Sequence, residues 1–269
     1  MDMLATTIIV TLIALSAGFA ALRVNRLKLY RTLESQTSNW APEVGRVEPL
    51  VPRDQSLPSF SQRLARLDVA LPQDSFDTVQ REIEGLVNTE RSYLPTHKKG
   101  GTVAYETLVQ RAPHTVALYR SPDMAGLVSA IVGETVTPTP LHDQSSCSVL
   151  FYERPGDHIG WHYDHNFYRG RHFTVLIPIL NRGHGPDGLS AAKLEARFGE
   201  RIEPIATPPN TLVVFEGQKV LHRVTPIEAG ERRIMLSMTF ATDARASRWQ
   251  GFKRRIKDTA FFGPRALWT

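Results

Sequence analysis

One short polar motif and one distant histidine constrain this chain more than any other feature. His162 and Asp164 are separated by a single residue, and His222 follows about 60 positions later. Alternate side chains of an extended strand point to the same side, so His162 and Asp164 can share one ion. Two imidazoles and one carboxylate on one face suit ferrous iron and leave open coordination positions. His222 must then return from a distant strand, which a β-barrel achieves by folding strands across one another.

The stretches around this motif have the composition of buried strands. They are rich in β-branched, aliphatic and aromatic residues and are bounded by turn-forming residues such as Pro, Gly and Asn. Four such runs are Ser146 to Tyr152, Phe173 to Leu180, Thr211 to Phe215 and Ile234 to Phe240. Residues 192–198 and 201–206 flank Gly199-Glu200 and are expected to form a hairpin. The pattern predicts a mainly β domain.

The region from about Ser146 to Ala241 resembles the Fe(II)/2-oxoglutarate dioxygenases, most closely the prolyl-4-hydroxylase-like branch. The residues that carry the resemblance are Tyr152, Gly156, His162, Asp164, residues 208–215 (PPNTLVVF), residues 222–227 (HRVTPI) and Gly230-Glu231-Arg232. The resemblance implies a fold that is mainly β with supporting helices. The expected architecture is a double-stranded β-helix, a jelly-roll or cupin-like barrel, over residues 138–243.

By this resemblance, His162, Asp164 and His222 are the ligands of Fe(II). In the family, a basic residue about ten positions past the distal histidine binds the far carboxylate of 2-oxoglutarate, which indicates Arg232. Arg233, on the opposite strand face, stays open as the alternative. A guanidinium suits this role because its fork matches a carboxylate.

Further candidate residues lie close to the metal motif. Tyr152, ten positions before His162, resembles a tyrosine that reaches the co-substrate in these enzymes. His165, Tyr168 and Arg169 follow the His-x-Asp pair and are candidates for the substrate rim, against the alternative of an ordinary polar loop.

The sequence also departs from the family pattern. The family usually has Gly-Gly-x-Leu at the head of the hairpin, whereas this chain has Asp187-Gly188-Leu189-Ser190. The loop at residues 182–188 is therefore a candidate for shaping the substrate mouth. Asp164 leaves no coordination position vacant for halide, which favours hydroxylation over halogenation.

The resemblance implies an enzyme that hydroxylates a C–H bond while 2-oxoglutarate is decarboxylated to succinate. Its cofactors would be Fe(II), 2-oxoglutarate and O₂, with ascorbate as a further candidate. The substrate is open between a lipid-linked or membrane-near small molecule and a peptide, as in peptidyl-prolyl hydroxylation. An alternative from another class is a non-catalytic barrel that binds a ligand. A zinc hydrolase is disfavoured because His-Glu-x-x-His and a Cys cluster are both absent from the sequence.

The N-terminal segment has the composition of a transmembrane helix. Leu4 to Leu22 carries no charge and is long enough to cross a hydrocarbon core of ~30 Å. Basic residues follow at once, so the positive-inside rule predicts a single-pass anchor over residues 1–24 with the catalytic domain on the cytoplasmic side. A cleaved signal peptide is the main alternative, although the basic residues that should precede its apolar core are missing. A buried amphipathic helix is disfavoured because no polar stripe is present.

The remaining segments are expected to support or tether the barrel. Residues 25–60 are polar and rich in proline and are expected to form a tether. Residues 61–137 are expected to form a helical support region, with helices over about 74–88 and 121–133 and an exposed loop at 96–101. The single cysteine, Cys147, excludes a disulfide within the chain.

The last segment, residues 244–269, is basic and aromatic. Trp249, Phe252 and Ile256 recur at helical spacing among Arg and Lys residues. Two interpretations stay open: a helix that packs this apolar stripe on the barrel, and a basic amphipathic helix that lies on a membrane surface. Nucleic-acid binding is not expected, because no binding motif accompanies the net charge of +5.

Overall fold

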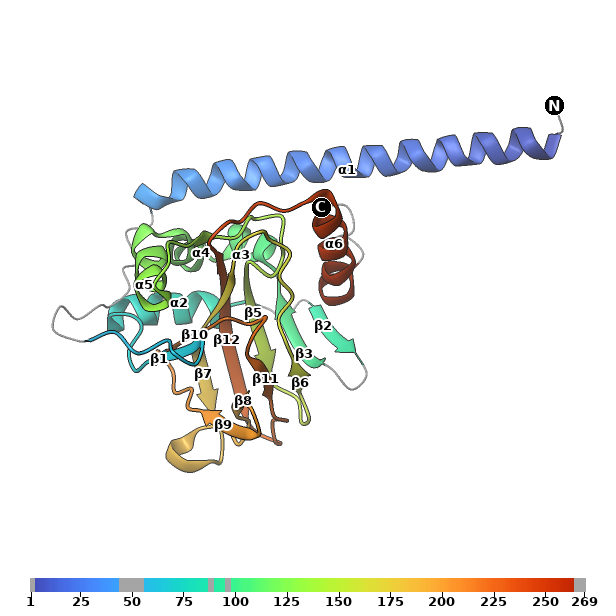
Figure 1. Ribbon diagram of the computed structural model, residues 1–269. Coiled ribbons are helices and arrows are strands. Elements are labelled where there is room, and N and C mark those ends of the chain that lie inside the picture. Colours follow the sequence, from blue (N-terminus) through green and yellow to red (C-terminus); the bar gives the residue numbers. More distant parts are fainter. Residues whose placement is uncertain (1–2, 44–55, 87–89, 95–97, 264–269) are drawn as a thin grey trace.

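The computed structural model describes residues 3–43, 56–86, 90–94 and 98–263, and it is dominated by one curled antiparallel sheet (Figure 1). The strands run in the order β1-β10-β7-β12-β5-β3-β6-β11-β8-β9, with β2 paired to β3 and β4 paired to β12. Their bounds are β1 Leu64–Leu67, β2 Glu90–Leu94, β3 Lys98–Val103, β4 Thr137–Pro138, β5 Cys147–Tyr152, β6 His158–His162, β7 His172–Arg182, β8 Leu194–Phe198, β9 Arg201–Ile205, β10 Leu212–Phe215, β11 Leu221–Val224 and β12 Arg232–Ala241.

The curled sheet forms two walls that face each other. In sheet order, the large wall consists of β1, β10, β7, β12, β5 and β3, and the small wall consists of β6, β11, β8 and β9. Strand β3 joins them because it pairs with β5 of the large wall and with β6 of the small wall. Successive residues of β12 show the two faces of the large wall. Ile234 and Leu236 pack in the cluster beneath the helices, whereas Met235 packs against residues of the small wall. The strand is buried on both faces, which explains its nearly continuous apolar sequence.

Helices α2 to α5 and the second half of α1 cover the outer face of the large wall, whereas α6 lies beside β2 and β3 (Figure 1). Their bounds are α1 Met3–Glu43, α2 Gln73–Glu84, α3 Tyr105–Arg111, α4 Pro113–Arg120, α5 Pro122–Val132 and α6 Arg248–Phe262, with a 3₁₀ turn η1 at Pro186–Gly188. The two helices expected from the sequence are present as α2 and α5. The Ser121 hydroxyl caps α5 by accepting from the Met124 N–H, and Gly133 ends it with φ 75°.

The region 61–137 contains strands as well as helices. Strand β1 extends the large wall through β10, and residues 98–101, expected as an exposed loop, belong to β3. Two lysines and two glycines have little strand propensity, so β3 owes its extended state to hydrogen-bonding partners on both sides. Residues 95–97 lie outside the described residues. The expectation of a purely helical support region is therefore corrected.

Helix α1 continues without a break past residue 24, where the sequence predicted a change to an extended tether. Tyr30 and Leu33 are buried against the domain, and the Gln144 side chain donates to the Tyr30 hydroxyl at 2.8 Å. Arg26 forms an ion pair with Glu106 of α3. The second half of α1 is thus part of the domain. Of the expected tether, residues 44–55 lie outside the described residues.

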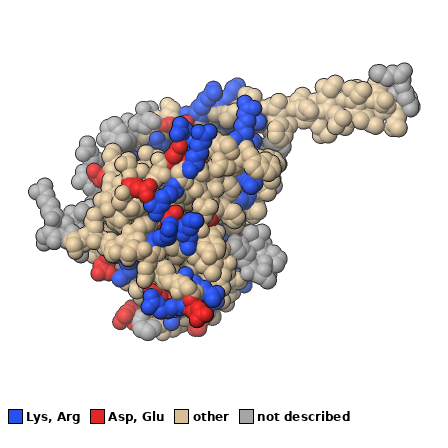
Figure 2. All heavy atoms as spheres, viewed as in Figure 1, with Lys and Arg blue, Asp and Glu red and all other residues tan. Residues whose placement is uncertain are grey.

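The first half of α1 projects away from the domain (Figure 1). In the space-filling view this projecting part carries no charged side chain, and Lys and Arg gather where it meets the domain (Figure 2). The described chain has one helix long and apolar enough to cross a membrane, Met3–Thr37, and this length and composition are also found in signal sequences.

Candidate metal centre and cavity

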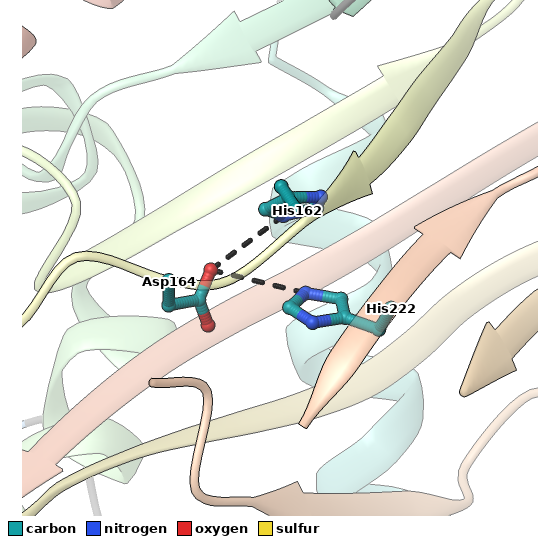
Figure 3. Close-up of side chains that lie close together, drawn as sticks. All are labelled: His162, Asp164 and His222. Atoms are coloured by element: carbon teal, nitrogen blue, oxygen red, sulfur yellow. Dashed lines mark ion pairs between the residues drawn. The ribbon is translucent and has the colours of Figure 1, made fainter. Parts of the chain in front are cut away.

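Three ligand side chains converge from two neighbouring strands of the small wall (Figure 3). His162 ends β6, and its direct partner in the antiparallel register is His222 on β11. Asp164 follows β6, where its N–H donates to the Gly217 carbonyl at 2.9 Å. Asp164 Oδ1 lies 3.6 Å from His162 Nε2 and 3.8 Å from His222 Nε2. The pair and the distant histidine are brought together as the spacing indicated.

The backbone fixes the orientation of both imidazole rings. His162 Nδ1 lies 2.8 Å from the Gly160 carbonyl, and His222 Nδ1 lies 3.0 Å from the Val220 carbonyl. A carbonyl only accepts, so each Nδ1 carries the proton and each Nε2 presents its lone pair to the centre. Such contacts set the tautomer of metal-binding histidines in general.

Asp164 is oriented by a hydroxyl and by a glycine. Thr174 Oγ1 donates to Asp164 Oδ2 at 2.6 Å, which leaves Oδ1 directed at the two histidines. A Cβ on Gly217 would overlap the Asp164 carboxylate, so only glycine fits there without moving it. Burial opposes ionisation, but His222, His162 and the Thr174 hydroxyl outweigh it and lower the pKa of Asp164 to about 2.

These three ligands fit a divalent iron ion. The ligand atoms all lie within 4.8 Å of one another, and they combine two imidazole nitrogens with one carboxylate oxygen. Because all three come from the same side, an ion held there would keep open positions toward the cavity.

The ligands line a cavity of about 360 Å³ between the two walls. One part is lined by apolar side chains around Leu176, Phe215 and Met235, and another part is lined by hydroxyl groups and lysines. Phe261 and Phe262 at the end of α6 also contribute to the lining. A largely apolar cavity with a few convergent polar groups is the usual form of a small-molecule site.

Arg233 and Tyr152 face this cavity from adjacent strands of the large wall, where they are register partners. Arg233 has no exposed surface, and its Nη1 donates to the Ala192 carbonyl at 2.7 Å. Its Nε and Nη2 and the Tyr152 hydroxyl have no hydrogen-bond partner among the described residues. Burial lowers the pKa of Arg233 to about 10, so the guanidinium is charged at neutral pH.

Arg232, which the sequence favoured, points the other way. Its guanidinium is paired with Glu153 at 2.7 Å, its side chain is 42 % exposed, and it does not line the cavity. Alternate residues of a strand face opposite sides, so one of the two arginines had to face outward. The order of preference between Arg232 and Arg233 is therefore reversed.

The three rim candidates lie in different surroundings. His165 lines the cavity and stacks on Phe167 with ring centroids 5.8 Å apart. Tyr168 is buried outside the cavity lining and donates to Asp143 Oδ2 at 2.8 Å, so it supports the fold there. Arg169 is exposed and does not line the cavity. Among the three, only His165 is placed to meet a ligand in this cavity.

The loop after β7 does not reach the cavity with any of its described side chains. The Glu231 carboxylate accepts from the backbone N–H groups of His184 and Ala191, which ties this loop to the turn before β12. The expectation that residues 182–188 shape the cavity mouth is thus not met.

Two lysines that the sequence did not single out line the cavity, Lys98 of β3 and Lys257 of α6. Lys98 belongs to the stretch that was predicted to be an exposed loop. Lys257 was noted only as part of a basic tail. Neither has a motif around it, and only the packing of β3 and α6 brings them to the cavity.

Comparison with known proteins agrees with the fold. A family model described as "Halogenase D" matches residues 56–183, which include His162 and Asp164 but end before His222. No curated protein sequence matches the chain.

Similar solved structures share the fold at low sequence identity. A prolyl hydroxylase of Trichoplax adhaerens, in complex with a hypoxia-inducible-factor peptide, is 15% identical with a TM-score of 0.53, covering 68% of this chain and 84% of that chain. A 2-oxoglutarate–Fe(II) oxygenase family protein of Burkholderia pseudomallei is 13% identical with a TM-score of 0.52, covering 79% and 94%. The epimerase SnoN of nogalamycin biosynthesis, described as non-heme and alpha-ketoglutarate-dependent, is 11% identical with a TM-score of 0.52, covering 66% and 77%.

The resemblance seen in the sequence is thus confirmed at the level of the fold: this chain has the double-stranded β-helix of the Fe(II)/2-oxoglutarate oxygenases.

Proposed function

We propose that this protein is a membrane-anchored Fe(II)/2-oxoglutarate-dependent dioxygenase that hydroxylates a C–H bond of its substrate. One observation carries the proposal. Three ligand atoms converge in the same cavity as the fully buried Arg233 and Tyr152. The Nε and Nη2 of Arg233 and the hydroxyl of Tyr152 have no hydrogen-bond partner among the described residues. Buried polar groups are normally paired, so the unpaired atoms indicate a ligand with an anionic end.

Each side chain has a distinct task in this proposal. His162, Asp164 and His222 would hold Fe(II) through Nε2, Oδ1 and Nε2. Arg233, with the Tyr152 hydroxyl beside it, would bind the far carboxylate of 2-oxoglutarate by charge-assisted hydrogen bonds. The bound iron and co-substrate together supply the activation of O₂ for attack on a C–H bond, with succinate as co-product. The apolar walls around Leu176, Phe215 and Met235 exclude water from this region.

Halogenation is the second candidate, motivated by the family model that matches residues 56–183. Asp164 argues against it, because a carboxylate oxygen directed at the two histidines occupies the position a halide would need. O₂ as the oxidising co-substrate and ascorbate as an auxiliary reductant of the iron are both parts of this proposal.

The membrane location rests on two helices. The projecting half of α1 would cross the bilayer once, with the Arg and Lys residues at its base on the cytoplasmic side. Helix α6 lies beside α1, since Arg23 and Leu27 border the same hollow as Gly251 and Arg255.

The outer face of α6 has the character of a membrane-surface helix. Trp249, Phe252 and Ile256 are 62%, 44% and 52% exposed, and Lys253 lies over the Trp249 ring. The helix buries Arg254, Asp258 and Phe262 instead, so the expectation that its apolar stripe packs on the barrel is wrong. Aromatic and basic residues on one exposed helix face are typical of contact with lipid headgroups.

We therefore propose a lipid-linked or membrane-near substrate. Peptidyl-prolyl or other protein hydroxylation is the alternative, suggested by the prolyl hydroxylase that shares the fold. A barrel that only binds a ligand is the alternative from another class.

The test is product analysis after incubation of the iron-loaded protein with 2-oxoglutarate, chloride, ¹⁸O₂ and membrane extract or proline-containing peptides. The proposal predicts a product that gains one labelled oxygen in the membrane fraction. A chlorinated product would establish the second candidate. Labelled peptide without labelled lipid would establish protein hydroxylation, and 2-oxoglutarate consumption that never exceeds the metal-free control would favour the non-catalytic barrel.

A further inference from the structure

Lys98 is a buried cation inside the cavity. Its residue is 4% exposed, and its ammonium donates to Thr102 Oγ1 at 2.9 Å and lies 5.0 Å from the centre of the Phe261 ring. Among the described residues, no carboxylate lies within ion-pair distance of it. One hydroxyl and one aromatic face are weak compensation for a charge withdrawn from water.

The protein itself does not need this charge. Burial, with a smaller contribution from Lys257, lowers the pKa of Lys98 to about 7. A buried ammonium without a counter-ion costs stability, and an apolar side chain of similar length would cost less. Residues that reduce stability in a cavity are commonly kept for binding or catalysis.

The second lysine of the cavity differs in this respect. Lys257 Nζ lies 2.8 Å from Asp258 Oδ1 and 3.6 Å from Asp143 Oδ1, and it donates to Ser145 Oγ at 2.6 Å. Its charge is compensated by these carboxylates, whereas Lys98 has no such partner among the described residues. Lys98 is therefore the cation that an incoming anion would meet.

Lys98 is separate from the proposed 2-oxoglutarate site. Its ammonium bonds to Thr102, whose register partner is Leu150, whereas Arg233 pairs with Tyr152, two residues further along β5. The hydroxyls of Ser148 and Ser237 line the cavity on the side away from Arg233.

We propose that Lys98 binds an anionic group, a carboxylate or a phosphate, on the organic substrate. Thr102 Oγ1 and the nearby serine hydroxyls would share its hydrogen bonds, and Phe261 would cover the substrate's apolar part. The identification of this anionic ligand as the substrate rests on the proposed function. The anion site itself does not depend on that function.

The test uses three probes with one chain length: octanoate, octyl phosphate and octanol. The full-length protein in detergent is loaded with Mn(II) and saturated with 2-oxoglutarate, so that Arg233 is already occupied. Calorimetry should show at least one anionic probe binding roughly tenfold or more tightly than octanol, a difference of ~1.4 kcal/mol. The comparison of octanoate with octyl phosphate distinguishes the two anion classes.

Two variants locate the effect. Lys98→Met should lose about tenfold in affinity for the preferred anion and none for octanol, and Lys98→Arg should recover part of it. Lys99→Met is the matched control, because Lys99 donates to the Pro155 carbonyl and does not line the cavity. Equal affinity of wild type for all three probes, or an unchanged anion affinity in Lys98→Met, would overturn the proposal.

Two further measurements distinguish a failure of the anion site from a loss of stability and from a failure of the proposed function. The thermal midpoint of Lys98→Met without anion should equal or exceed that of wild type, because a buried charge is removed; a clear decrease would mean that Lys98 supports the fold instead. Binding of Mn(II) and 2-oxoglutarate is measured in the same samples. If neither binds while the anion preference for Lys98 persists, the proposed function fails and the anion site stands.

Discussion

Asp164 depends on neighbours that no ligand motif contains. Thr174 stands ten residues away in sequence, on the central strand β7, and its hydroxyl holds the carboxylate oxygen that faces away from the histidines. Gly217 leaves room for that carboxylate. The orientation of the ligand is therefore set by the large wall and by a turn, in addition to β6 itself.

Replacing Thr174 by Val should weaken metal binding without unfolding the protein. The substitution keeps the shape of the side chain but removes the hydrogen bond that orients Asp164, and loss of such a contact generally costs about 10- to 100-fold in metal affinity. Anaerobic titration with Mn(II) measures the effect. Thr211→Val is the control, since Thr211 is a buried threonine that bonds to Pro208 outside the cavity. Equal losses in both variants would contradict the role assigned to Thr174.

The two neighbouring arginines should give opposite results. Arg233→Met should reduce 2-oxoglutarate affinity by at least about 30-fold, since losing one partner of a buried charge pair costs ~2 kcal/mol or more. Arg232→Met should change it by less than about twofold, because a half-exposed pair with Glu153 contributes little. Fluorescence or calorimetric titration of the Mn(II)-loaded protein distinguishes them, and a larger effect of Arg232 would refute the assignment.

At this scale the sequence predicted which three metal-binding side chains lie together, but not which of the two arginines faces the cavity. A His-x-Asp pair and a distant histidine can be identified as candidate ligands without knowing the register of the strands that carry them. The choice between Arg232 and Arg233 depends on which strand face each occupies. Arg233, Met235 and Ser237 alternate regularly along β12 and line the cavity, so Arg232 lies on the opposite face. The spacing from His222 does not say which of the two faces is turned toward the cavity.

Among the secondary-structure elements, those with a clear internal pattern were predicted correctly. Strands β5, β7, β10 and β12, the β8–β9 hairpin and helices α2 and α5 fall within a few residues of their expected bounds. Strand β3 was missed because its composition favours a loop and only pairing makes it a strand. Helices α3 and α4 were not predicted, because Pro113 separates them and each is too short to show a clear helical periodicity in the sequence.

The exposed apolar stripe of α6 is predicted to bind a membrane surface. Replacing Trp249, Phe252 and Ile256 by Gln should reduce binding to anionic liposomes by roughly tenfold or more, because the exposed apolar stripe is lost. The thermal midpoint should stay unchanged, since the stripe does not pack on the domain. The comparison is made in protein lacking residues 1–24, which retains Tyr30 and Leu33 of the packed half of α1.

Ile202→Gln provides the control for this experiment. Ile202 is comparably exposed but lies on β9, at the opposite end of the domain from α6 (Figure 1). If it weakens liposome binding as much as the triple substitution, or if the triple substitution has no effect, α6 is not a membrane-contact helix.

At the scale of the whole molecule, α1 is a single helix that joins the projecting apolar segment, the proposed membrane anchor, to the half that packs on the domain. Removing residues 1–24 should leave 2-oxoglutarate turnover with a soluble substrate analogue intact, because Arg26 and the buried half of α1 remain. Turnover of substrate embedded in vesicles should fall strongly. Unchanged turnover of the vesicle substrate would count against a membrane-presented substrate, and a mature protein that begins after residue 21 would identify the segment as a cleaved signal.

The arrangement of the whole chain follows from where the ligand strands sit. The small wall carries the proposed iron ligands and the large wall carries Arg233 and Thr174. Helices α2 to α5 and the second half of α1 pack on the outer face of the large wall. The cavity is therefore bounded by elements from both walls and by the end of α6. The sequence predicted the barrel, but the closure of the cavity by α6 depends on packing that no local pattern encodes.

The central claim is that His162, Asp164 and His222 hold one ferrous ion beside 2-oxoglutarate. The most direct measurement is anaerobic addition of Fe(II) and 2-oxoglutarate, followed by absorption spectroscopy for the weak visible metal-to-ligand charge-transfer band. The band should appear in wild type and in His158→Ala, whose imidazole lies outside the cavity, and should be lost in His162→Ala and His222→Ala. A band that persists in those two variants, or that never forms in wild type, would contradict the claim.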